Sequence, residues 1–232
     1  QKYYLYQILL SLILILKFLQ IYFYGSVWTD YPLEIHNDYS SALSILENGV
    51  PKLSSWQHSS MALDILNYIN IGKIFIDSLI MKILNLNLEF FYITHLFGFI
   101  FYFFCILYFI KLEIKLKYKL LFILLIFTDS FFQNLSRPTL LYGVALALLA
   151  SSFILNRNYK FNYFIAGLLS TLSFFSFAIL GVLLILSIYF YIFFMYYFKK
   201  ASFFDILQLV VGSIFPIILI LFWFYIFFDI ER

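Results

Sequence analysis

Three acidic residues spaced four apart are the residues best placed to do chemistry: Asp30, Glu34 and Asp38. Residues four apart share one face of a helix. Asp30 followed by Pro32 is typical of a helix start, with the aspartate capping and the proline in the first turn. Carboxylates gathered on one face can supply a general base or hold a divalent cation. A solvated acidic face would show the same pattern, so both interpretations stay open.

Among the basic residues, Arg137 has the position that is most informative about a binding role. It precedes Pro138 at a turn between two apolar runs, with Asp129 shortly before. A guanidinium at the lipid headgroup level is suited to bind a phosphate bidentately. The ordinary alternative is a side chain that extends along apolar surface toward water.

The elements that must position these residues are membrane helices. Of the 232 residues, 64% are hydrophobic and 12% are charged, and the mean hydropathy is +0.96. A soluble domain is nearer half apolar and a quarter charged. A net charge of +3 without a basic stripe argues against a nucleic-acid partner. The single cysteine, Cys105, excludes a disulfide within the chain and a cysteine-based metal site.

Apolar runs of about 20 residues mark membrane-spanning helices. They predict an all-α, polytopic transmembrane bundle of about seven spans. Gly181 is expected to divide one continuous apolar stretch into two of them. The predicted spans are Tyr4–Tyr24, Leu88–Ile110, Leu120–Asn134, Thr139–Leu155, Tyr163–Gly181, Val182–Phe198 and Ile206–Phe228.

The segment 61–86 is long enough to span, but charged and amide residues interrupt it. Because an isolated charge at the bilayer centre costs about 2.5–3.5 kcal/mol, we predict an interfacial helix instead. Seven spans then place nine of the fifteen basic residues on one side. The positive-inside rule makes that side, with the N-terminus, cytoplasmic. Residues 25–87 become a large outer first loop that carries juxtamembrane helices.

The order of these features resembles the GT-C superfamily of polyprenyl-phosphate-sugar glycosyltransferases. That family includes protein O-mannosyltransferases, lipid A aminoarabinose transferases and Rgt-like lipopolysaccharide-core enzymes. The resemblance rests on three stretches: WTDYPLEIHNDYSSALSILENGVPKLSSWQ (28–57), LDILNYINIGKIFIDSLIMKIL (63–84) and DSFFQNLSRPTLLYG (129–143). Tyr39, Ala42, 45–47 and Gly49 are similar to the first short helix of the family's outer loop. The acidic pair common in that loop is missing, so the main acid can be Asp30, Glu34 or Asp38.

The resemblance implies that residues 1–232 are one membrane module, the size of the family's N-terminal seven-span part. Because the chain begins at Gln1 and stops just past an apolar run, we expect the natural protein to be longer. The implied activity is inverting transfer of a sugar from a polyprenyl-phosphate carrier to a glycan, lipid or protein acceptor. It would take place at the outer face of the plasma (inner) membrane.

The resemblance also implies roles for the site residues. Asp30 or Asp38 would be the general base, and Arg137, with Lys52 or Lys73, would bind the leaving phosphate. The sequence identifies no cofactor beyond a candidate divalent cation. The alternative is a non-catalytic transporter, flippase or polymerase-type protein for envelope glycans, which would carry ionisable residues along a path through the membrane.

Overall fold

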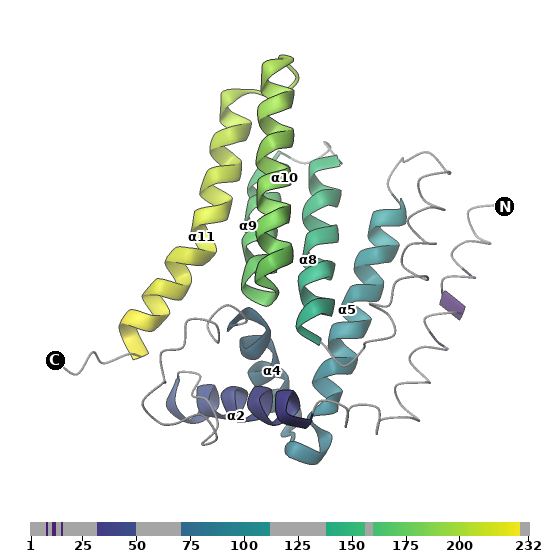
Figure 1. The fold of residues 1–232 in the computed structure, drawn as a ribbon, viewed down its shortest axis with the longest axis vertical. Coiled ribbons are helices and arrows are strands. Elements are labelled where there is room, and N and C mark those ends of the chain that lie inside the picture. The colour runs from purple at the N-terminus through teal and green to yellow at the C-terminus, as the bar shows by residue number, and fades with distance from the viewer. Residues whose placement is uncertain are drawn as a thin grey trace.

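The computed structural model describes residues 8, 11–12, 15, 32–49, 71–111, 138–155 and 160–227. Several predictions fall outside these residues: the span 120–134, nearly all of the span 4–24, and residues 61–70 of the interfacial helix. Asp30, Lys52 and Arg137 also lie outside them. Within the described residues the fold is all-α, and no strand occurs among them (Figure 1).

Five helices run side by side as a bundle, and two further helices lie at one end of it (Figure 1). The bundle helices are α5 (Tyr92–Lys111), α8 (Pro138–Leu155), α9 (Asn162–Ser176), α10 (Ala178–Tyr197) and α11 (Phe203–Phe227). We call the other two, α2 (Pro32–Asn48) and α4 (Ile71–Leu84), the end helices. A short 3-10 helix, η3 (Leu88–Phe90), leads into α5.

The ends of the bundle differ in their charges. The last residues of α5 and α8, the first residues of α9 and the turn from α10 to α11 all lie at the end opposite to α2 and α4 (Figure 1). Lys160, Lys199 and Lys200 are exposed there, and α5 ends at Lys111. The end helices and these exposed lysines are therefore separated by the length of the bundle.

Helix α9 is the centre of the bundle and packs against α8, α10 and α11. Two glycines allow α9 and α11 to pack closely. A Cβ atom at Gly167 would lie 2.3 Å from the Leu209 carbonyl oxygen, and a Cβ atom at Gly212 would lie 2.0 Å from the Phe164 carbonyl oxygen. Hydroxyl groups add hydrogen bonds between helices. Thr171 Oγ1 donates to the Ser213 carbonyl at 3.0 Å. Small residues and hydroxyls at crossings are typical of helices that pack in lipid.

The break between α9 and α10 lies at Phe177, four residues before the predicted position. Phe177 is extended (φ −154°, ψ 95°), and its N–H donates to the Ser173 carbonyl. Gly181 instead lies in the first turn of α10, where a Cβ would be 2.1 Å from Phe174 Cα. This glycine therefore permits the close approach of the two helices rather than ending one of them.

Among the described residues, one helical segment is long and apolar enough to cross a membrane: Phe203–Trp223, with a mean hydropathy of 2.5. Only 22% of it is buried within the protein. Pro216 lies inside α11, as predicted, and the helix bends along its length (Figure 1). Shorter apolar helices cover Leu96–Phe109, Tyr142–Leu155 and Gly181–Tyr197. The bundle of seven spans stays a prediction.

Helix α2 begins at Pro32, in agreement with the predicted helix start. It ends before Gly49, whose left-handed conformation (φ 77°) favours glycine and whose N–H donates to the Ile45 carbonyl at 2.9 Å. Its buried face packs on α4 and on Phe91, the residue just before α5. The contacting hydrophobic residues are Ala42, Ile45, Ile74, Met81 and Phe91. This small core fixes α2 against α4.

Candidate functional site

An ionic cluster lies where α2 packs on α4. It consists of Asp38 of α2 with Lys73 and Asp77 of α4. Lys73 Nζ donates a hydrogen bond to Asp38 Oδ2 and lies 2.7 Å from Asp77 Oδ2. The side chains of Lys73 and Asp77 are fully buried, whereas that of Asp38 is 22% exposed. Asp38 is therefore the one member of the cluster that a ligand can reach.

Local sequence accounts for one of the two ion pairs in the cluster. Lys73 and Asp77 are four apart on α4, so their side chains meet on one face of the helix. Asp38 comes from 35 residues earlier and is brought to them by the packing of α2. The ring of Phe91 lies 5.9 Å from Lys73 Nζ and adds a cation–π contact.

The cluster carries one more negative charge than positive when all three groups are ionised. Burial alone would lower the pKa of Lys73, but attraction from Asp38 and Asp77 outweighs it and leaves that pKa raised above 10.5. Burial raises the pKa of Asp77 to about 6, a rise that Lys73 reduces and Asp38 increases. Lys73 therefore stays charged, while Asp77 keeps its proton to a higher pH than an ordinary aspartate because its pKa is raised.

Asp77 is poorly supplied with hydrogen bonds. Its contact with Lys73 has the distance of an ion pair, yet neither carboxylate oxygen has a hydrogen bond of standard geometry within the described residues. The nearby hydroxyl of Thr94 donates instead to the Phe91 carbonyl at 2.9 Å. Tyr142 of α8 in turn donates to the Thr94 carbonyl at 3.1 Å. Asp77 thus depends on Lys73 as its cationic partner.

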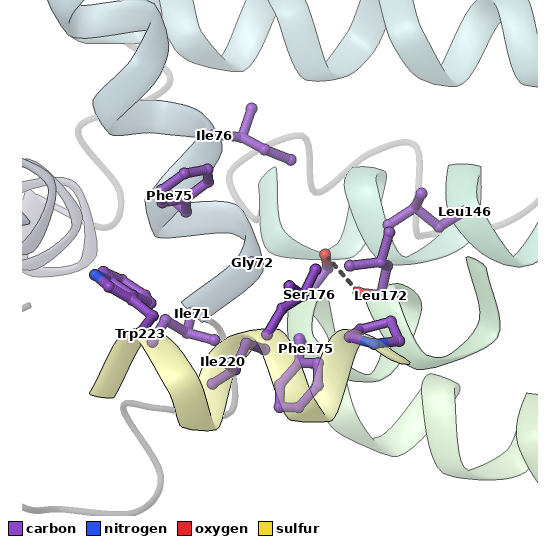
Figure 2. Close-up of a pocket in the computed structure, with 12 residues that line it drawn as sticks. Ile71, Gly72, Phe75, Ile76, Leu146, Leu172, Phe175, Ser176, Ile220 and Trp223 are labelled. Carbon is purple, nitrogen blue, oxygen red and sulfur yellow. Dashed lines mark hydrogen bonds between the residues drawn. The ribbon is translucent and has the colours of Figure 1, made fainter. Parts of the chain in front are cut away.

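An apolar cavity of about 390 Å³ lies beside α4 and between α8, α9 and α11 (Figure 2). Figure 2 shows Phe75 and Ile76 of α4 facing this space, with Trp223 and Ile220 of α11 on another side. The rings of Phe75 and Trp223 meet edge to face, with centroids 5.7 Å apart. The remaining lining residues are Ile71, Gly72, Leu146, Leu172, Phe175, Ser176, Pro216 and Leu219.

Helix α4 therefore connects two different environments. Lys73 and Asp77 contribute to the ionic cluster, and their neighbours Gly72 and Ile76 line the cavity. This arrangement can receive a molecule that has a polar head and a long hydrocarbon chain.

The structure brings together two residues that the sequence assigned to different roles, Asp38 as a base and Lys73 as a phosphate ligand. Glu34 lies one turn before Asp38 on α2, and its side chain lies outside the described residues. Sequence reasoning did not select Asp77, although its spacing from Lys73 was a usable signal. No group of three or more metal-binding side chains occurs in the described part of the chain. The predicted divalent cation stays a prediction.

No protein-family model, curated protein or solved structure matches this chain.

Proposed function

We propose that this chain is a membrane glycosyltransferase that transfers a sugar from a polyprenyl-phosphate carrier to an acceptor. The observation that carries the proposal is the arrangement around α4. Asp38 of α2 is a partly exposed carboxylate held in an ionic cluster by Lys73 of α4, and α4 also lines an apolar cavity that reaches α11. A donor with a sugar-phosphate head and an isoprenoid tail needs both environments at one site.

A multi-pass membrane location is supported by helix length and by exposed apolar surface. At 1.5 Å per residue, α5 and α10 are roughly 30 Å long, close to the thickness of the hydrocarbon core. Large side chains on α10 and α11 face outward, including Phe190, which is 75% exposed, and Phe222, which is 60% exposed. Surface of this kind is typical of contact with lipid.

We orient the protein with the end helices outside. The exposed lysines at the other end of the bundle favour the cytoplasmic side. The ionic cluster then lies at the outer membrane surface, at the level of lipid headgroups. A lipid-linked sugar donor presents its phosphate at that level.

In the proposed reaction, Asp38 takes the proton from an acceptor hydroxyl as general base. The acceptor oxygen forms a bond to the anomeric carbon of the sugar. The bond between that carbon and the carrier's phosphate oxygen breaks, and the phosphate leaves with the electron pair. Lys73 is neutralised by two carboxylates, so we assign the leaving phosphate to Arg137 and Lys52.

The test is a transfer assay in membranes that contain the protein and radiolabelled polyprenyl-phosphate sugars. We expect Asp38→Asn to lower the transfer rate by about 100-fold or more, because it removes the base. Glu47→Gln is the matched control, since Glu47 is an exposed carboxylate on the same helix. Transfer by Asp38→Asn at the wild-type rate would show that Asp38 is not the base. Carrier binding without transfer in the wild type would favour a transporter or flippase.

A further inference from the structure

We propose that Asp77 is a positioning residue, which holds the Lys73 ammonium so that Lys73 orients the Asp38 carboxylate. The effect on catalysis rests on the proposed function. The link that Lys73 makes between the carboxylates of Asp38 and Asp77 does not rest on it. The proposal gives a role to a fully buried carboxylate that is not among the residues lining the apolar cavity and has no hydrogen bond of standard geometry among the described residues.

The geometry of Lys73 supports this role. A lysine side chain has four rotatable bonds, and its ammonium offers three donors without a fixed direction. Two carboxylates on different helices restrict it: Asp77 comes from its own helix, one turn later, and Asp38 from α2. Because Lys73 is also fully buried, its ammonium cannot turn toward water. The position of Asp38 is thus set by a cation that Asp77 holds in place.

The charges around Asp77 show why Asp77 would act on Asp38 through Lys73. Asp38 of α2 and Lys73 of α4 are the ionisable groups of the cluster that act on Asp77. Helix α5 presents the Thr94 hydroxyl, and Phe91, between η3 and α5, presents its ring. Helix α8 reaches Thr94 through the Tyr142 hydroxyl. Helix α9 packs on α4 with the Ser176 hydroxyl near Gly72. Asp38 and Asp77 repel each other, so any favourable coupling between them passes through the shared lysine.

The first measurement is a double-mutant cycle read by thermal unfolding of the purified, detergent-solubilised protein. It compares Asp38→Asn, Asp77→Asn and the combined variant, in the wild-type background and in Lys73→Met. With Lys73 present, the combined shift of the unfolding midpoint should differ from the sum of the single shifts by about 2 °C or more. With Met at position 73, the non-additivity of the wild-type background should be lost. The same non-additivity in both backgrounds would overturn the proposal.

The second measurement is the transfer assay, which separates positioning from simple stability. Asp77→Asn should lower kcat at least tenfold with little change in KM, while its unfolding midpoint at pH 7.5 stays at or above that of the wild type. The double variant that combines Lys73→Met with Asp77→Asn should recover the thermal stability that Lys73→Met alone loses. It should not recover the transfer activity. The control is Lys82→Met, which removes an exposed charge from the same helix.

The outcomes are distinguishable. Wild-type kcat and pH profile in Asp77→Asn, or restored transfer in the combined variant, would overturn the positioning role. A wild-type protein that transfers no sugar would refute the proposed function alone, because the thermal cycle would still test the bridge through Lys73.

Discussion

The crossing of α9 and α11 allows a stability prediction to be worked out in detail. A Cβ added at Gly212 would lie 2.0 Å from the Phe164 carbonyl oxygen, and it would also lie 2.8 Å from the carbonyl carbon. Real Cβ atoms essentially never come within 3.0 Å of such atoms, so the helices must separate by about 1 Å. Backbone atoms cannot rotate away as a flexible side chain would.

Overpacking of this kind costs about 1–3 kcal/mol. The separation would also stretch the hydrogen bond from Thr171 Oγ1 to the Ser213 carbonyl, now 3.0 Å long, which is worth roughly 0.6 kcal/mol more. We therefore expect Gly212→Ala to destabilise the protein by about 2–4 kcal/mol. For a chain of this size the unfolding midpoint should fall by roughly 4–15 °C.

The assay is thermal unfolding in detergent, followed by tryptophan fluorescence and by aggregation. Gly72→Ala is the matched control, since its Cβ would lie 3.3 Å from the nearest atoms and needs a shift of only a few tenths of an ångström. Its midpoint should change by less than half as much. If Gly212→Ala unfolds at the wild-type temperature, the close crossing of α9 and α11 is wrong.

Two further predictions concern α4 and the apolar cavity beside it. The pKa of Asp77 is raised from 3.8 to about 6, so protonation of Asp77 stabilises the folded protein. This contribution to the free energy of unfolding is complete below pH 3.8 and is lost as the pH rises through about 6. Unfolding midpoints measured from pH 4 to 7.5 should show this fall in the wild type relative to Asp77→Asn, and parallel curves would contradict it. Trp223 lines the apolar cavity beside Phe75, so a polyprenyl phosphate should change the tryptophan emission of the wild type and affect that of Trp223→Phe much less. An equal change in both proteins would show that the chain does not enter the cavity.

The all-α class and the positions of several helices could be predicted from the sequence, because hydropathy and helix-start chemistry are local signals. The start of α2 at Pro32 and the helix α4 within 61–86 follow from such signals. So does α11 with its internal proline, Pro216. In each case the pattern lies within the element itself.

The remaining features depend on packing between distant segments. Asp38 meets Lys73 only because Ala42 and Ile45 of α2 pack against Ile74 of α4, which spacing within one segment does not reveal. The break between α9 and α10 lies at Phe177 because the chain reverses there. Hydropathy is continuous across that point, so the sequence offered only a nearby glycine as a signal.

The central claim of the proposed function is that the ionic cluster lies on the outer side of the membrane, opposite to Lys160, Lys199 and Lys200. Cys105 is the single cysteine and is buried, so Cys105→Ala provides a background for introducing one cysteine at a time. Glu47 is exposed on α2, and Lys199 is exposed at the turn between α10 and α11. In intact cells, a membrane-impermeant maleimide should label the Glu47→Cys variant, and it should label Lys199→Cys only after permeabilisation. Labelling of both positions from outside, or of Lys199→Cys alone, would contradict the account.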